Sequence, residues 1–365
     1  MVSVKVINLR KRFDKTVAVD GVSFEVLDGE FVVLLGPSGC GKTTTLRCIA
    51  GLESPDEGEI YIGDRLVNDL PPKDRDVAMV FQSYALYPHM TVFDNLAFPL
   101  KMRKYSKDEI SRRVREVAQL LRIDHLLDRK PRQLSGGEQQ RVALGRALVR
   151  NPKVWLMDEP LSNLDAKLRV YMRAELKKLQ KDLRITTIYV THDQAEAMAM
   201  ADRIAVMNKG KLLQYDSPHV VYEKPANLFV GGFIGAPPMN FIDATIVEES
   251  GQIFLDTGIF KYSLNLELAN IIKSKATGEK VILGFRPEDI SLSVEKRPES
   301  IFQADLYVIE PMGSNIIVDL KAGEYLLKAV LPSTTRLPQV GEKVWIFFPL
   351  DKLHIFDAKT ECTII

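Results

Sequence analysis

The sequence predicts a parallel α/β domain that contains a helical insertion, followed by a second domain made of β-strands. Short continuous apolar runs alternate with helical patterns in the first part of the chain, as in strands buried on both faces of a parallel sheet. From about residue 91 to residue 150 the hydrophobic period is helical. After about residue 235, many short strand patterns follow at close spacing, which favours a small antiparallel barrel.

The predicted α/β core includes the buried strand Phe31–Leu35. Glycines follow it, and Lys42–Ala50 then reads as a helix that ends at Gly51. Further strands are expected at 77–81, 154–157 and 185–190, with a long helix at 166–183 between the last two. Strands that alternate with helices in this way build a parallel sheet.

The helical insertion carries a capping-box pattern, Ser106 with Glu109 three residues later. Its apolar face is formed by residues spaced three or four apart: Ile110, Val114, Val117 and Leu121. A Gly-Ala-Pro-Pro run at 235–238 indicates a linker. The tail strands are expected at 241–247, 253–256, 280–285, 316–320, 325–331 and 343–348, with one helix near 264–272.

Composition argues against several classes of protein. The chain has 365 residues and a net charge of +1, which gives no reason to expect a nucleic-acid partner. No apolar stretch approaches the eighteen or so residues that a membrane helix needs, and the N-terminus alternates like a strand rather than a signal peptide. Any role at a membrane is therefore expected to be peripheral. The three cysteines form no CxxC pair, so we expect a reducing, cytoplasmic compartment.

The strongest motif is Gly-Pro-Ser-Gly-Cys-Gly-Lys-Thr at 36–43, which fits the phosphate-binding pattern between a strand and a helix. Glycines let successive backbone N–H groups converge on phosphate oxygens, and the following helix start adds partial positive charge. The bland alternative is a glycine-rich turn that precedes a helix. The nucleotide-binding residues expected here are Gly36, Pro37, Ser38, Gly39, Cys40, Gly41, Lys42, Thr43 and Thr44.

Cys40 has two readings. A helix N-terminus lowers a thiol pKa, which would suit redox sensing; the preferred reading is a small loop residue beside bound phosphate.

Two strand ends carry polar residues suited to hydrolysis. Asp158 and Glu159 follow the strand at 154–157, where Asp158, with Thr43, is placed for Mg²⁺ and Glu159 for activating water as a general base. His192 follows the strand at 185–190, where it is placed to donate to developing charge on the γ-phosphate. The alternatives are solvated acids that end a strand and a structural histidine.

A second anion site is indicated by Leu-Ser-Gly-Gly-Glu-Gln-Gln-Arg at 134–141, which opens a helix. This segment, the phosphate loop, the 158–159 pair, Ser-Asn-Leu-Asp at 162–165 and His192 stand in the order seen in ABC-type ATPases. Over about residues 1–235 the chain therefore resembles that family.

The resemblance implies a head-to-tail homodimer that encloses two ATP molecules. Ser135, Gly136, Gly137 and Gln139 of one protomer would contact the ATP held by the other, and Asp165 would lie at the dimer interface. Gln82 would reach Mg²⁺ and the attacking water, and Phe13 would stack on adenine. The implied cofactors are ATP and Mg²⁺.

The resemblance also implies that residues 82–95 contact two integral-membrane permease subunits. The apolar and aromatic side chains of that segment could instead be ordinary core: Tyr84, Leu86, Tyr87 and Phe93.

The tail resembles the ATPase subunits of bacterial and archaeal maltose and multiple-sugar importers, through residues 231–242 and Gly-Phe-Arg-Pro-Glu-Asp at 284–289. That resemblance implies a domain at 1–235 with a helical subdomain at about 91–150, a linker at 236–240, and an OB-like domain of the TOBE/MOP type at 241–365. It further implies a peripheral place on the cytoplasmic membrane face, an extracytoplasmic solute-binding protein as indirect partner, and a regulator on the tail.

Importers of polyamines, ferric iron or sulfate share this layout and remain alternatives. A soluble ABC ATPase that acts on nucleic acid is a different class, since OB-like barrels bind oligonucleotides. A regulator that uses ATP as a switch is a third. The balanced charge and the single cassette favour the importer and no nucleic-acid partner.

Overall fold

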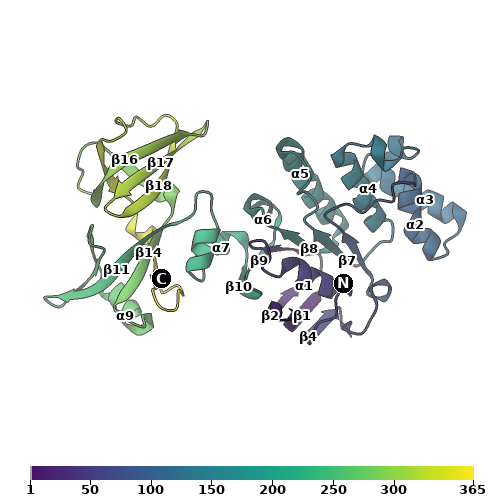
Figure 1. Ribbon diagram of the computed structural model, residues 1–365, viewed down its shortest axis with the longest axis horizontal. Helices are drawn as coiled ribbons and strands as arrows, with labels where there is room; N and C mark the ends of the chain where they lie inside the picture. The colour runs from purple at the N-terminus through teal and green to yellow at the C-terminus, as the bar shows by residue number, and fades with distance from the viewer. Residues whose placement is uncertain (1) are drawn as a thin grey trace. The chain divides into compact units, whose positions relative to one another are not determined.

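The computed structural model describes residues 2–365, which form two compact units, one up to His219 and one from Val220 to Ile365 (Figure 1). The first unit is mixed α/β, and the second is mainly β. The predicted fold class is confirmed.

The centre of the first unit is a six-stranded sheet in the order β10-β9-β3-β8-β7-β6. All its strands run parallel except β10, which pairs antiparallel with β9 at the edge. Every residue of β3, β7 and β8 is buried, as their continuous apolar runs predicted. The strand bounds are β3 Phe31–Leu35, β6 Val77–Val80, β7 Val154–Asp158, β8 Thr186–Thr191, β9 Arg203–Asn208 and β10 Lys211–Asp216.

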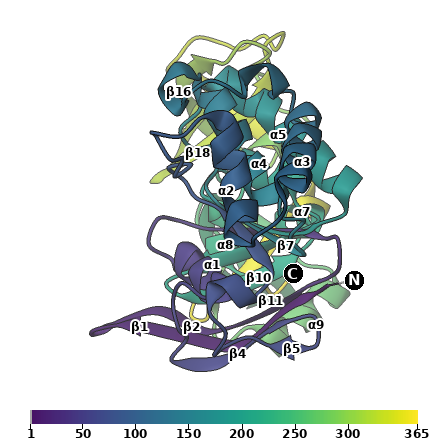
Figure 2. The same ribbon diagram turned by 90° about the vertical axis from the view of Figure 1, so that its right-hand side faces the viewer.

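A smaller antiparallel sheet, ordered β2-β1-β4-β5, shares one hydrophobic core with the parallel sheet and helix α1. Figure 2 shows β1, β2 and β4 side by side. The bounds are β1 Val4–Phe13, β2 Thr16–Val26, β4 Glu57–Ile62 and β5 Arg65–Leu66.

Helices α2, α3 and α4 form the helical insertion and lie together in Figure 1. Helix α1 ends at Gly51 with φ of 77°, the left-handed cap that glycine adopts without strain. Only half of the predicted capping box forms in α3: Ser106 accepts from the Glu109 N–H, but the Glu109 carboxylate pairs with Arg112 and Arg113. The helices are α1 Lys42–Ala50, α2 Val92–Met102, α3 Lys107–Leu120, α4 Gly136–Leu148, α5 Ala166–Leu183 and α6 Gln194–Met200, with 3₁₀ turns at Pro72–Asp74, Asp124–Leu126 and Pro131–Gln133.

The second unit contains two five-stranded antiparallel sheets that share one core. Phe285 stacks on Phe348, and Phe260 stacks on Phe302, with ring centroids 4.5 and 5.0 Å apart. The first sheet is ordered β13-β12-β11-β14-β20: Lys261–Ser263, Gln252–Asp256, Asn240–Glu249, Lys280–Phe285 and His354–Asp357. The second is ordered β15-β19-β16-β17-β18: Ser291–Ser293, Lys343–Phe347, Phe302–Pro311, Asn315–Ala322 and Tyr325–Pro332.

Four of these strands, β13, β15, β16 and β20, were not expected from the sequence. Three of them have only three or four residues, too few for an alternating pattern to stand out. The remaining elements are helices α7 Pro218–Glu223, α8 Leu228–Phe233 and α9 Leu266–Lys275, and 3₁₀ turns at Pro287–Asp289 and Leu350–Lys352.

The division between the units lies ahead of the boundary expected at residue 235, because α8 and its flanking loops are bonded to the tail. The buried Arg286 guanidinium donates to the backbone carbonyls of Tyr222, Gly231 and Ile234. The Leu228 N–H donates to the Glu361 carbonyl at 2.8 Å. The Gly-Ala-Pro-Pro run therefore lies inside the second unit.

Candidate active site

The phosphate loop joins β3 to α1, and two of its glycines admit no side chain. A Cβ at Gly36 would lie 2.2 Å from the Met207 carbonyl oxygen, and one at Gly41 would lie 2.3 Å from that of Ala18. Gly41 also has φ of 102°, a conformation that L side chains rarely adopt. The motif is therefore required by the packing of the loop as well as by its backbone angles.

Lys42 folds its ammonium group into this loop. Its Nζ donates to the carbonyls of Gly36 and Pro37 at 2.7 and 2.9 Å, and the residue is 5% exposed. A full positive charge thus lies inside the phosphate loop. Cys40 is 3% exposed, and burial raises the pKa of its thiol. A neutral, buried thiol favours the packing role for Cys40 over redox sensing.

Thr43 and Asp158 meet across the start of α1 and the end of β7. The Thr43 hydroxyl donates to Asp158 Oδ1 at 2.9 Å, and Asp158 is 7% exposed. Burial raises the pKa of Asp158, and the bond from Thr43 opposes that rise. Two adjacent hard oxygen ligands, one of them a carboxylate without a cationic hydrogen-bond partner, suit Mg²⁺, which commonly takes one or two protein oxygens plus substrate phosphates. Residues 2–365 contain no group of three or more histidine, cysteine, aspartate or glutamate side chains that could hold a metal ion.

Glu159 has a left-handed backbone, with φ of 45°. Such a conformation is unfavourable for a non-glycine residue and is found at functional sites. It is held on both sides: the Glu159 N–H donates to the Val190 carbonyl of β8 at 3.0 Å, and the Ser162 hydroxyl donates to the Glu159 carbonyl at 2.9 Å.

The Glu159 carboxylate lies between two other predicted catalytic residues. Its Oε1 is 3.1 Å from His192 Nδ1, and its Oε2 accepts from Gln82 Nε2 at 3.4 Å. The Glu159 side chain is 18% exposed and that of His192 55% exposed, so a solvent molecule can reach the group. The structure therefore brings Gln82, Glu159 and His192 together, with Asp158 directly preceding Glu159.

Glu196, which sequence reasoning missed, fixes the strand end before His192. Its buried Oε2 accepts from the hydroxyls of Tyr189 and Thr191, each at 2.8 Å. Burial raises the pKa of Glu196. Nothing in the alanine-rich sequence around Glu196 marks it as buried. Asn163, also missed, donates to the Gln82 carbonyl at 2.8 Å.

The segment 134–141 forms a rigid start to α4. Ser135 and Glu138 make a complete capping box, in which the Ser135 N–H and hydroxyl donate to Glu138 Oε2 at 2.7 and 2.8 Å. The bond from the Ser135 N–H lowers the pKa of Glu138. A Cβ at Gly137 would lie 2.9 Å from a Leu168 methyl carbon, so glycine lets α5 approach α4 closely.

Gln139 Nε2 donates to the carbonyls of Pro131 and Leu134, each at 3.2 Å. The side-chain hydrogen bonds of Ser135 and Gln139 that the structure describes thus stay within residues 131–139. Gly136 is the first residue of α4, and a Cβ there would lie 3.5 Å from a Leu164 methyl carbon, an ordinary contact. The structure leaves this second anion site out of the network that joins the other predicted residues.

The two remaining predicted site residues are exposed. Phe13, at the end of β1, is 44% exposed, and the Lys11 ammonium lies 5.3 Å from its ring centroid. Asp165 caps α5 by accepting from the Leu168 N–H at 3.0 Å. Neither contacts the hydrolytic residues through a described hydrogen bond.

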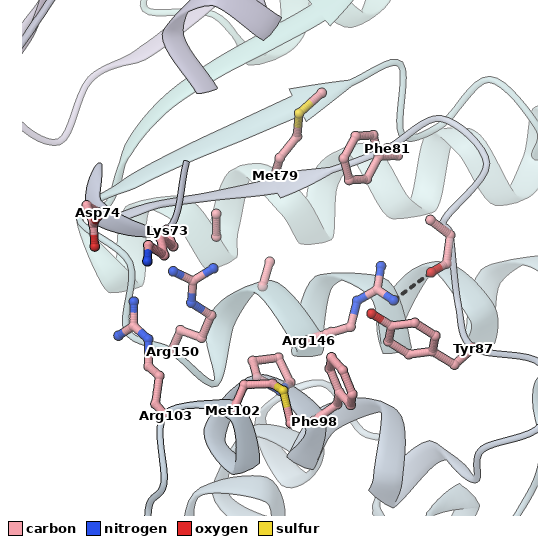
Figure 3. Close-up of a pocket in the computed structure, with 14 residues that line it drawn as sticks. Lys73, Asp74, Met79, Phe81, Tyr87, Phe98, Met102, Arg103, Arg146 and Arg150 are labelled. Atoms are coloured by element: carbon pink, nitrogen blue, oxygen red, sulfur yellow. Dashed lines mark hydrogen bonds between the residues drawn. The ribbon is translucent and has the colours of Figure 1, made fainter. Parts of the chain in front are cut away.

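A groove of about 760 Å³ lies beside residues 82–95 and between β6, α2 and α4 (Figure 3). Met79 and Phe81 line one side and Phe98 and Met102 the opposite side, and the side chains of Arg146 and Arg150 lie between them. We call it the α2–α4 groove. Its full lining is Lys73, Asp74, Ala78, Met79, Phe81, Ala85, Tyr87, Phe98, Pro99, Met102, Arg103, Arg146, Ala147 and Arg150.

Arg146 holds the wall of the α2–α4 groove that faces residues 82–95. It donates to the carbonyls of Ala85 and Tyr84 at 2.6 and 2.9 Å, and burial lowers its pKa. Of the aromatic and apolar residues that could have been core, only Tyr84 is fully buried; Leu86, Tyr87 and Phe93 are half-buried. No helix within residues 2–365 has both the length and the apolar character to cross a membrane.

Comparison with known proteins matches three families along the chain. Residues 19–162 match the ABC transporter family, residues 235–290 the MalK OB fold domain, and residues 283–356 the TOBE domain.

Curated relatives match the chain almost end to end. It is 56% identical to the trehalose/maltose import ATP-binding protein MalK of Thermococcus litoralis, over 99% of both chains. It is 48% identical to the oligosaccharides import ATP-binding protein MsmX of Bacillus subtilis, over 100% of both, and 48% identical to the sn-glycerol-3-phosphate import ATP-binding protein UgpC of Ruegeria pomeroyi, over 99% and 98%.

Among solved structures, the dimeric post-hydrolysis state of the ATP-binding cassette MJ0796 bound to ADP and Pi is 35% identical, with a TM-score of 0.53. The match covers 59% of this chain and 98% of that one.

Proposed function

The chain belongs to the ABC transporter ATPases, and on that premise we propose that it hydrolyses ATP to drive import of a sugar or oligosaccharide through a membrane permease. The observation that carries the proposal is the placement of Glu159 against His192 and Gln82, directly after Asp158 and beside the phosphate loop. The end-to-end similarity to import ATP-binding proteins supports the direction of transport and the class of solute.

Each hydrolytic residue has one role in this proposal. Lys42 and the loop amides bind the β- and γ-phosphates. Glu159 removes a proton from the attacking water, and its carboxylate is held by its contacts with His192 and Gln82. Gln82 orients the water, and His192 donates an N–H to the charge that develops on the phosphate.

Thr43 and Asp158 are the residues that would hold Mg²⁺. When bound, Mg²⁺ neutralises charge on the phosphate oxygens. Phe13, exposed at the end of β1, offers a face on which adenine can stack.

Two protomers complete each site in this proposal. Ser135, Gly136, Gly137 and Gln139 of one protomer contact the ATP held by the other, and Asp165 lies at their interface. The rigid start of α4 supports this, since an oriented helix N-terminus is a ready anion site. The solved cassette that resembles this chain is itself a dimer.

In the proposed homodimer, the α2–α4 groove of each protomer receives a helix of one of the two permease subunits. This docking places the chain peripherally at the cytoplasmic membrane face. The groove supports this because its walls are apolar and because its described lining carries the basic side chains Lys73, Arg103 and Arg150 with one acid, Asp74. Docking there would act on Gln82 through the segment that Arg146 holds.

Met102→Glu tests the docking. Met102 is 65% exposed, so the change leaves folding and the ATPase activity of the isolated chain intact. The added charge enters an apolar wall and should abolish co-purification with the permease, whereas Leu120→Glu, 49% exposed on the neighbouring helix outside the groove, should not. Unchanged co-purification of the Met102 variant would place the permease elsewhere.

The second unit has a separate role in the proposal: its OB-like domain holds the dimer together during turnover and receives a regulatory protein. The chain divides functionally at the boundary of the units, with the motor up to His219. An extracytoplasmic solute-binding protein acts on this chain indirectly, through the permease.

Uptake by vesicles that contain the chain, its permease pair and solute-binding protein tests the function. ATP with Mg²⁺ should drive accumulation of labelled trehalose, maltose or longer oligosaccharides, and EDTA should stop it. Accumulation of sn-glycerol-3-phosphate, a polyamine, ferric iron or sulfate instead would change the solute class. ATP hydrolysis stimulated only by nucleic acid would reject the importer.

A further inference from the structure

Arg169, in the first turns of α5, bridges two segments on either side of it. Its Nη2 donates to the carbonyls of Ser162 and Leu164 at 3.2 and 3.1 Å. Its Nη1 lies 3.5 Å from Asp193 Oδ2. One guanidinium thus joins residues 162–165, which we call the interface loop, to residues 191–193, which we call the histidine turn.

The two segments are already joined once at their other ends. Ser162 is bonded to the Glu159 carbonyl, and the Glu159 carboxylate contacts His192. With the bridge through Arg169, the contacts close a ring that runs Glu159, His192, Asp193, Arg169, Ser162 and back to Glu159.

Asp193 connects Arg169 to the residues around His192 through further hydrogen bonds. Its Oδ1 accepts from the N–H groups of Ala195 and Glu196 at 2.8 and 3.1 Å, which fixes the start of α6. Its own N–H donates to the Thr191 hydroxyl at 2.9 Å. His192 therefore lies between Thr191 and Asp193, which are bonded to each other, and Asp193 also contacts Arg169.

The guanidinium occupies this place at a cost. Its Nε–H is buried and has no hydrogen-bond partner among the described residues. A buried donor without a partner destabilises the folded chain, and such groups call for an explanation beyond packing. The contacts of Nη1 and Nη2 explain why an arginine occupies this position, because only its planar fork reaches carbonyls of one segment and a carboxylate of another at once.

We propose that Arg169 is a positioning residue that couples the interface loop to the histidine turn, so that contacts made at Asp165 when the dimer closes set the position of His192. Arg169 touches neither ATP nor water in this scheme; it acts through Asp193. The proposal rests on the proposed function, which assigns Asp165 to the interface and His192 to catalysis.

Turnover and nucleotide affinity of three variants test the coupling. Arg169→Met should lower kcat about tenfold and leave KM for ATP within about twofold, because the phosphate loop is untouched. Asp193→Asn keeps the acceptor that caps α6 but places an NH₂ group against Arg169, and it should show the same split. Arg173→Met is the matched control: one helical turn along, Arg173 donates only to the Ala195 carbonyl and should keep parental kinetics.

The double variant Arg169→Met/Asp193→Asn decides whether the two residues form one link. Non-additive loss, with the double variant no slower than the worse single variant, is expected. Additive losses, or parental kcat in either single variant, would overturn the coupling. Thermal unfolding of each variant separates a lost link from a misfolded chain, since Asp193→Asn at a part-exposed site should unfold like the parent.

The failure of this inference is distinguishable from failure of the proposed function. If Glu159→Gln and His192→Ala both hydrolyse ATP like the parent, the catalytic assignment itself fails. If they are inactive while Arg169→Met is unaffected, only the coupling is wrong.

Discussion

Glu159→Gln should remove hydrolysis and keep nucleotide binding. The substitution preserves the shape of a side chain that lies 3.1 Å from His192 Nδ1 and 3.4 Å from Gln82 Nε2, but it removes the proton acceptor. Loss of a general base costs roughly 10²–10⁴ in rate, or about 3–5.5 kcal/mol. Lys42 makes its hydrogen bonds within the phosphate loop and none to Glu159, so ATP affinity should not fall.

Phosphate release at saturating ATP, a binding titration with ATP, and light scattering measure the three consequences. The variant should bind ATP like the parent, release phosphate at least about a hundredfold more slowly, and accumulate as an ATP-bound dimer. Glu116→Gln is the matched control, because Glu116 pairs only with Arg112 on the exposed face of α3. Turnover near that of the parent in Glu159→Gln would refute the role of Glu159.

Two further predictions concern the dimer and the tail. Lys42→Ala and Ser135→Arg should each be inactive alone, yet their mixture should recover part of the activity, because a heterodimer pairs an intact phosphate loop with an intact α4 start; hydrolysis by Ser135→Arg alone at the parental rate would contradict the composite site. A chain that ends at His219 should keep measurable ATPase activity with weaker dimerisation, and residues 220–365 should not bind nucleic acid. Salt-sensitive, submicromolar binding of single-stranded DNA by that tail would revive the nucleic-acid reading.

Exposure of the tail aromatics bears on this last prediction. Stacking of single-stranded bases requires exposed rings along a positive groove. Phe260, Phe302 and Phe348 are core, whereas Tyr307 is 55% exposed. Trp345 and Phe347 are half-buried at alternate positions of β19, with the side chains of Lys296 and Arg297 over their rings.

Elements whose pattern is local were predicted closely. The helices at Lys42–Ala50 and Ala166–Leu183 and the buried strand Phe31–Leu35 have the bounds that their apolar periods and caps indicated. The tail was predicted less well: its strand spacing indicated one small barrel, whereas the structure has two sheets around one core. The strands that the sequence did not predict are mostly short, and their pairing partners can lie far along the chain, as in the pairing of β20 with β14.

The proximity of the proposed hydrolytic residues could be predicted from sequence because each follows a strand of one parallel sheet, and the carboxyl ends of such strands meet at a single edge. Asp158, Glu159 and His192 needed only that rule. Gln82 was placed by family resemblance, and the structure adds its bond to Glu159.

The sequence by itself determined what depends on spacing along the chain: the glycines of the phosphate loop, the order of the motifs, the buried strands and the helical insertion. Only the tertiary structure decided which side chains from distant segments of the chain contact one another. Glu196 is a buried acceptor for Tyr189 and Thr191, and Arg169 spans the interface loop and the histidine turn. An acid or an arginine on a helix reads from sequence as a solvated charge, because the neighbours that bury and bond it come from other segments of the chain.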